Sequence, residues 1–154
     1  MVNVLGTDLA VLPHGVAHDA SAADLVLRWT PRRVWLQGPS SEGADLSTLA
    51  GRENLAQALI LRLLTPRGAL SSLGHSEYGS RLHTLIGERK TAALRALCRA
   101  FVLEVVAQEP RVESKAVSLA FDEDEERFDS LVFTLAVTPV TGGDPVALGL
   151  ELGL

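Results

Sequence analysis

The apolar residues of this chain change their period at Pro110, and this change limits the folds that the chain can adopt. Before Pro110 they recur at spacings of three and four, which is typical of helices that bury one face. After it they alternate, which is typical of strands. Helices followed by strands, rather than interleaved with them, predict an α+β domain.

The helical pattern predicts three helices between residues 51 and 108. The first begins near Arg52 and ends before Pro66, because a proline cannot continue the hydrogen-bond ladder. A short second helix carries Leu82, Leu85 and Ile86. The third runs from about residue 88 to 108, where Pro110 ends it. We expect these helices to form a small layer on the sheet.

The alternating pattern predicts a mostly antiparallel sheet made of a C-terminal hairpin and a final strand. Residues 117–121 and 131–137 form the hairpin around the acidic run 122–126, and residues 146–152 form the last strand. We interpret the acidic run as a solvated turn. It has no glycine of the kind that a calcium-binding loop requires.

The first fifty residues lack a sustained period, and prolines and glycines interrupt them. We expect an N-terminal arm over residues 1–50, with short strands near residues 9–12 and 25–29, and an α+β domain over residues 51–154. Trp29 and Trp35 lie in this arm. They either attach it to the core or anchor a partner.

The residues that could carry chemistry do not form a recognisable site. His14 and His18 are four apart, but Pro13 and Gly15 disfavour the helix that would align them on a metal. The remaining histidines, His75 and His83, suit surface or structural roles. Four acids that a glycosidase could use, namely Glu53, Glu77, Glu88 and Glu104, are not paired by the sequence. We expect no catalytic, cofactor-binding or metal-binding residues.

The one cysteine and the hydropathy give expectations for the thiol and for the location of the protein. Cys98 lies on the apolar stripe of the long helix and is expected to be a buried thiol. No apolar run is long enough to span a bilayer, and the first residues do not form a basic secretory leader. We therefore expect cytoplasmic assembly without membrane insertion.

The charge is distributed unevenly along the chain. Residues 51–111 hold nine basic and five acidic side chains, whereas residues 112–154 hold two basic and nine acidic ones. A basic centre beside an acidic end fits either nucleic acid or two protein neighbours of different charge. The basic residues that would form a nucleic-acid surface are Arg62, Arg67, Arg81, Arg95 and Arg99.

An ordered series of short motifs resembles the baseplate-wedge and sheath-initiator family of contractile phage tails and phage-tail-like injection systems. The resemblance covers about residues 46–152. Its motifs are GRENLAQA at residues 51–58, RLLTPRG at 62–68, YGSRL at 78–82, LIGE at 85–88 and EPRV at 109–112. The family was once labelled lysozyme-like and is better understood as structural.

The resemblance implies a non-enzymatic subunit that joins wedge proteins to the first sheath ring, in several copies within a symmetric particle released from the cell. Contacts with tube or hub proteins are also possible in such a particle. By this resemblance Glu109, Pro110 and Arg111 contact a helical bundle of the wedge proteins. The sheath-facing strands would carry the following residues: Leu131, Phe133, Leu135, Val137, Val146, Leu148, Leu150 and Leu152.

Three alternatives stay open at this stage. On residues alone, the Glu109-Pro110-Arg111 corner is an ordinary helix stop with an internal Glu–Arg pair. A peptidoglycan-cleaving glycosidase is the second alternative for the whole chain. A nucleic-acid-binding module is the third, although the arginines are scattered and aromatic residues are few.

Overall fold

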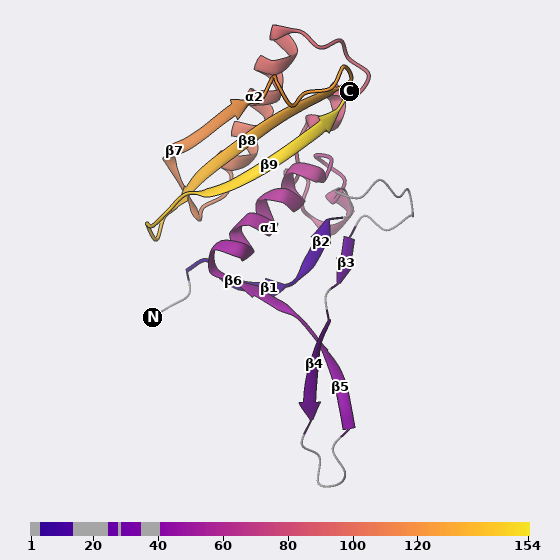
Figure 1. The fold of residues 1–154 in the computed structure, drawn as a ribbon, viewed down its shortest axis with the longest axis vertical. Helices are drawn as coiled ribbons and strands as arrows, with labels where there is room; N and C mark the ends of the chain where they lie inside the picture. The colour runs from indigo at the N-terminus through magenta and orange to yellow at the C-terminus, as the bar shows by residue number, and fades with distance from the viewer. Residues whose placement is uncertain (1–3, 14–24, 28, 35–40) are drawn as a thin grey trace. The chain divides into compact units, whose positions relative to one another are not determined.

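The computed structural model describes residues 4–13, 25–27, 29–34 and 41–154 of the chain (Figure 1). Its contacts divide it into two compact units, Met1–Gln57 and Ala58–Leu154, so that the division falls within a helix. His14, His18, Trp35 and the side chain of Trp29 lie outside the described part of the chain. The predicted division into an arm over residues 1–50 and a domain over residues 51–154 stays a prediction.

The described residues of the first unit form three antiparallel strand pairs. Strand β1 (Thr7–Leu9) pairs with β6 (Thr48–Ala50), β2 (Val11–Pro13) with β3 (Leu25–Leu27), and β4 (Trp29–Val34) with β5 (Ser41–Leu46). The two strands expected near residues 9–12 and 25–29 are thus present. The alternation of apolar residues did not predict strands β1, β4, β5 and β6 as separate elements. Short strands with many polar residues show little alternation.

Helix α1 (Gly51–Leu64) begins in the first unit, and two buried amides in its first half fasten the N-terminal strands. The amide nitrogen of Asn54 donates to the Leu5 carbonyl at 2.9 Å. Gln57 donates to the Leu9 carbonyl at 2.8 Å and accepts the Val11 N–H at 2.6 Å. These bonds pair one buried and two partly buried backbone groups of the N-terminal strands and their flanking residues.

The second unit has one long helix, α2 (Ala92–Ala107), which begins later than the predicted residue 88. The side chain of Thr91 accepts the Leu94 N–H at 3.1 Å and so caps the helix at this point. Cys98, predicted to be buried on this helix, has no exposed surface, and burial raises the pKa of its thiol to about 11.

The prediction of three helices is wrong, because the described residues contain two α-helices. The segment Leu82–Leu85, here η2, forms only a four-residue 3-10 turn, and Ser71–Leu73 forms another, η1. Glycines at positive φ, Gly79 and Gly87, stand on either side of η2 and leave too few residues for an α-helix to nucleate. The class remains α+β.

A three-stranded antiparallel sheet follows α2 in the order β7 (Val112–Phe121), β8 (Ser130–Pro139) and β9 (Val146–Gly153) (Figure 1). Its register places Phe121 beside Phe133 and Leu135 beside Leu148. The central strand β8 supplies much of the core, and α2 packs against β7. The predicted hairpin and final strand are confirmed. No described helix is long and apolar enough to cross a membrane.

Two backbone segments approach closely between α1 and η2. The Arg67 N–H donates to the Ser80 carbonyl and the Ser80 N–H to the Thr65 carbonyl, both at 2.8 Å. Between these bonds Gly79 adopts φ +106°, and a Cβ there would lie 2.5 Å from the Thr65 oxygen. Glycine is required at this position both by conformation and by space.

We predict that Gly79→Ala lowers the free energy of unfolding by about 3 kcal/mol or more, because the methyl group meets backbone atoms that cannot move independently. Gly74→Ala is the matched control. Gly74 also has a positive φ, but nothing lies within 4 Å of a Cβ placed there. Urea unfolding of both variants measures the difference, and equal losses would contradict the steric explanation.

Candidate functional site

The Glu109-Pro110-Arg111 corner is a tight turn at the end of α2. The Val112 N–H donates to the Glu109 carbonyl at 3.1 Å, so Pro110 occupies the second position of a β-turn, for which its fixed φ is suited. The fork of Arg111 grips the Glu109 carboxylate, with Nε to Oε1 at 2.6 Å and Nη2 to Oε2 at 3.1 Å. The internal Glu–Arg pair, one of the alternatives that the residues left open, is thus present.

The carboxylate of Glu109 is buried and ionised. The residue is 4% exposed. Burial by itself raises the pKa of Glu109, but the hydrogen bonds and charge of Arg111, with a smaller contribution from Arg62, more than offset it and hold the pKa below its usual value. Arg62 lies 4.0 Å from this carboxylate and also donates to the Gln108 carbonyl.

Outward from the corner, Pro110 and Gln108 are exposed and Arg111 is about one-fifth exposed, with 22% of its side-chain surface accessible. Two donors of Arg111 already face Glu109, so the whole fork is not presented to a partner as the residue type alone suggested. The wedge contact of Glu109, Pro110 and Arg111 stays a prediction. If it is correct, Glu109 acts by holding Arg111 in place.

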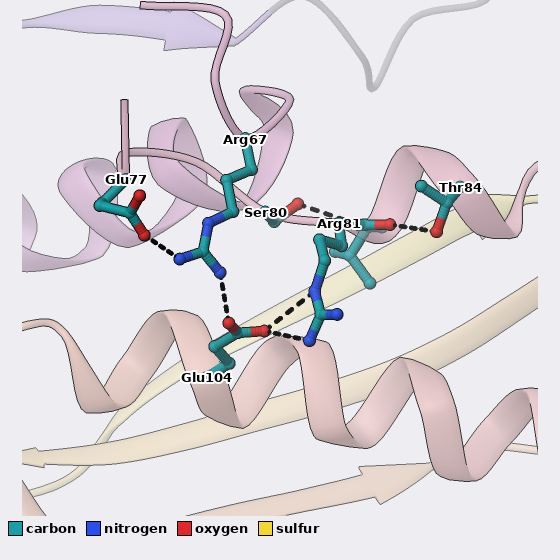
Figure 2. Close-up of polar contacts among 7 residues, drawn as sticks. Arg67, Glu77, Ser80, Arg81, Thr84 and Glu104 are labelled. Carbon is teal, nitrogen blue, oxygen red and sulfur yellow. Dashed lines mark hydrogen bonds and ion pairs between the residues drawn. The ribbon is translucent and has the colours of Figure 1, made fainter. Parts of the chain in front are cut away.

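A second cluster joins the Gly79 loop to α2 (Figure 2). Arg67 binds both Glu77 and Glu104, and Arg81 makes two bonds to Glu104 Oε2, at 3.1 Å from Nε and 2.6 Å from Nη2. The guanidinium of Arg81 also stands 4.2 Å from the centre of the Phe101 ring. The cluster therefore attaches the loop to α2 at two points, Arg67 and Arg81.

This cluster contains two of the four acids considered for glycoside hydrolysis, Glu77 and Glu104. Their ion pairs with arginine are unfavourable for a general acid. The hydrogen bonds of Arg81 and then of Arg67 lower the pKa of Glu104 despite some desolvation. A general acid needs the opposite, a raised pKa that keeps its proton near neutral pH. Arg67, bound to both carboxylates, has its own pKa raised, first by Glu77. The arrangement is that of a structural ion-pair cluster.

The predicted sheath-facing side chains lie largely in the core. Leu131, Phe133, Leu135 and Val137 are at most 1% exposed, Val146 and Leu148 are 7% exposed, and Leu150 and Leu152 are partly exposed. The sheet instead presents β9 as an edge strand, because no described strand other than β8 pairs with it. A partner strand would therefore meet backbone groups of β9 rather than these side chains.

The interpretation of the acidic run as a solvated turn needs correction at Glu126. Its side chain is 1% exposed and binds Lys90 at 2.7 Å and Arg95 at 2.5 Å, whereas the four acids before it are exposed. Burial raises the pKa of Glu126, but these two cations more than offset that effect and lower it. No local sequence pattern indicates this contact, because Arg95 lies 31 residues away.

The arginines considered for nucleic-acid binding are engaged within the protein. Arg62, Arg67, Arg81 and Arg95 each bind carboxylates, and Arg99 stands 5.6 Å from the centre of the Phe121 ring. A continuous basic surface needs side chains directed away from the protein. Within the described part of the chain, no three His, Cys, Asp or Glu residues are grouped so that they could hold a metal ion.

Comparison with known proteins gives a likeness of fold. No family model matches the chain, and no curated protein does. A crystal structure of a protein from Geobacter sulfurreducens, provisionally named a tail lysozyme, superimposes with a TM-score of 0.55 at 19% sequence identity. The match covers 66% of this chain and 89% of the other. This chain therefore shares its fold with a protein whose name refers to a tail.

We predict that Arg111→Ala destabilises the protein by about 3 kcal/mol, because it leaves the buried Glu109 carboxylate without its main partner. The double variant Glu109→Gln with Arg111→Ala should recover part of this loss, since a neutral amide costs less to bury than a carboxylate. Urea unfolding of the two single variants and the double variant measures the coupling. Strictly additive losses would show that the pair does not interact.

We also predict that acid weakens the protein through Glu109. A carboxyl whose pKa is lowered on folding stabilises the folded state above its unfolded pKa of about 4.3, and this contribution disappears as the pH falls through the folded pKa. Between pH 7 and pH 3, the free energy of unfolding should fall more for the wild type than for Glu109→Gln. Parallel pH profiles of the two proteins in urea unfolding would rule out this contribution.

Proposed function

We propose that this chain is a structural subunit of a contractile, phage-tail-like particle, which joins baseplate wedge proteins to the first ring of sheath and initiates sheath assembly. The observation that carries the proposal is the position of the residues behind the family resemblance. Three of its motifs form one connected framework: Arg67 in RLLTPRG and Arg81 in YGSRL hold the helix whose end is the EPRV turn. The fold shared with a tail-named protein supports the same conclusion.

The wedge contact is assigned to the outer side of the corner. There Pro110 and Gln108 are exposed, and Arg111 keeps part of its surface accessible while Glu109 orients it. A charged group that is already oriented loses little side-chain entropy on binding. The expected partner is a helical bundle of the wedge proteins.

The sheath contact is assigned to the border of β9. The positions of β9 that point away from the core carry small or charged residues, namely Ala147, Gly149, Glu151 and Gly153. A partner strand added there would form main-chain hydrogen bonds along the strand, and these resist force applied during contraction. The register of this addition would follow from the alternation of β9.

In this proposal the chain is not an enzyme and needs no cofactor or metal. It is assembled in the cytoplasm in several copies, within a particle that is then released, and tube or hub proteins are further neighbours. The competing function is peptidoglycan hydrolysis, which the name of the Geobacter protein favours. Peptidoglycan turnover by the purified chain would establish that function instead.

The proposal predicts that lysines on β9 block the sheath and spare the baseplate. In Ala147→Lys with Gly149→Lys, nothing lies within 4 Å of a Cβ at position 149, so the fold should be retained while the charged strand rejects an added one. Electron microscopy of particles that carry the variant should show complete baseplates with little or no sheath.

The matched control is Ala120→Lys, an exposed alanine on β7 at the opposite border of the sheet. Particles with this variant should carry sheath of normal length. Normal sheath on the β9 variant, with circular dichroism showing that both variants are folded, would refute the assignment of the sheath contact to β9.

A further inference from the structure

The turn between β7 and β8, residues 122–130, buries one of its charged side chains and exposes the others. Only 1% of the side-chain surface of Glu126 is accessible, whereas the residues at 122–125 and 127–129 are all exposed. Even the apolar Phe128 is 96% exposed. The hydrophobic effect therefore contributes little to holding this turn in place, and a segment of this kind can open locally.

The carboxylate of Glu126 is held by two cations from another part of the chain. Its Oε2 lies 2.7 Å from Lys90 Nζ and 2.5 Å from Arg95 Nη2. Its Oε1 is buried and has no hydrogen-bond partner among the described residues. The attachment of the turn to these two cations therefore passes through one oxygen atom.

The backbone of the turn is linked to Lys90 and to the end of β9. Lys90 Nζ donates to the Arg127 carbonyl at 2.8 Å. The N–H of Leu154, which follows β9, donates to the Asp129 carbonyl at 2.7 Å. The turn accordingly lies beside the C-terminal end of β9 (Figure 1). Release of the turn would free this end of the edge strand as well.

We propose that Glu126 is a pH-sensitive switch: its ionised carboxylate holds the β7–β8 turn on Lys90 and Arg95, and its protonation releases the turn and the end of β9. With a neutral Glu126, the two cations face each other without the charge that now lies between them, and they repel. Release stays local because Leu131 and Phe133, just beyond the turn, are buried in the core.

The other charged groups near this site do not replace Glu126. Glu123 lies 3.6 Å from Arg95, but 71% of its side-chain surface is exposed, so water screens this pair. Arg99, the other arginine in this half of α2, stands over the Phe121 ring. The remaining acids of the turn are exposed and pair with neither cation in the described structure, namely Asp122, Asp124, Glu125 and Asp129.

The pH at which the turn is released follows from the direction of the pKa shift. Burial raises the pKa of Glu126, but the hydrogen bonds and charges of Lys90 and Arg95 more than offset this effect and lower the pKa. Such a carboxyl stabilises the folded state above its unfolded pKa of about 4.3, and this contribution is lost as the pH falls through the folded pKa. The turn is therefore held at neutral pH and released in acid.

Hydrogen exchange of the purified chain, resolved to single amides by NMR, tests the switch. Glu126→Gln removes the charge and keeps the shape of the side chain. At pH 7 it should reduce the protection of the Arg127 and Leu154 amides at least about tenfold, which is the effect of one pKa unit. The amides of β8 between Leu131 and Val137 should keep their protection to within about twofold.

The matched control is Glu123→Gln, which removes a charge near the same arginine from an exposed side chain. It should leave the protection of the turn within about twofold of the wild type. Equal protection of the turn in Glu126→Gln and in the wild type at pH 7 would overturn the switch. Equal losses in the two variants would also overturn it, because the effect would then not be specific to the buried carboxylate.

The wild type tests the same switch without any substitution. Protection is expressed relative to an unstructured peptide at the same pH, which removes the intrinsic pH dependence of exchange. Between pH 6 and pH 3, the amides of Arg127 and Leu154 should lose protection before those of β8 do. Simultaneous loss in the turn and in β8 would mean global unfolding and would overturn local release.

Discussion

The second unit depends on the close contact between the backbone at Thr65 and the backbone at Ser80, which only a glycine at position 79 permits. This contact closes a loop of about fifteen residues that has little regular structure of its own, and loop closure costs conformational entropy. The ion pairs of Arg67 and Arg81 with Glu104 then hold the closed loop on α2. Because these arginines are partly exposed, their main role is to select one arrangement, while the buried leucines and valines supply most of the stability.

The corner at the end of α2 illustrates how one pair of residues can serve both folding and binding. Glu109 is buried and needs a cation, and Arg111 supplies it while keeping part of its surface accessible. A substitution at either residue therefore changes stability and any docking together. For this reason the edge of β9, which pairs with no described strand other than β8, is a surface that can be tested more cleanly.

The elements with strong periodicity were predictable from the sequence, and those fixed by distant contacts were not. Leu55, Leu59 and Leu63 repeat every four residues and are buried on α1, and the alternation from Leu131 to Val137 became the central strand of the sheet. The prediction of an α-helix at Leu82 is wrong because the three apolar residues Leu82, Leu85 and Ile86 are too few to distinguish an α-helix from a 3-10 turn. Glu126 appeared solvated because its partners, Lys90 and Arg95, are brought to it only by the fold. The exposure of the candidate docking residues could not be predicted from residue type: Leu131, Phe133, Leu135 and Val137 are buried, and Arg111 is mostly covered.

The thiol of Cys98 is shielded on the core side of α2, with a pKa of about 11. At neutral pH only about one molecule in ten thousand therefore carries the reactive thiolate. The chain has no other cysteine with which to form a bond. Burial thus protects this thiol from oxidation, and the covalent structure of the chain at Cys98 should be the same in reducing and in oxidising surroundings.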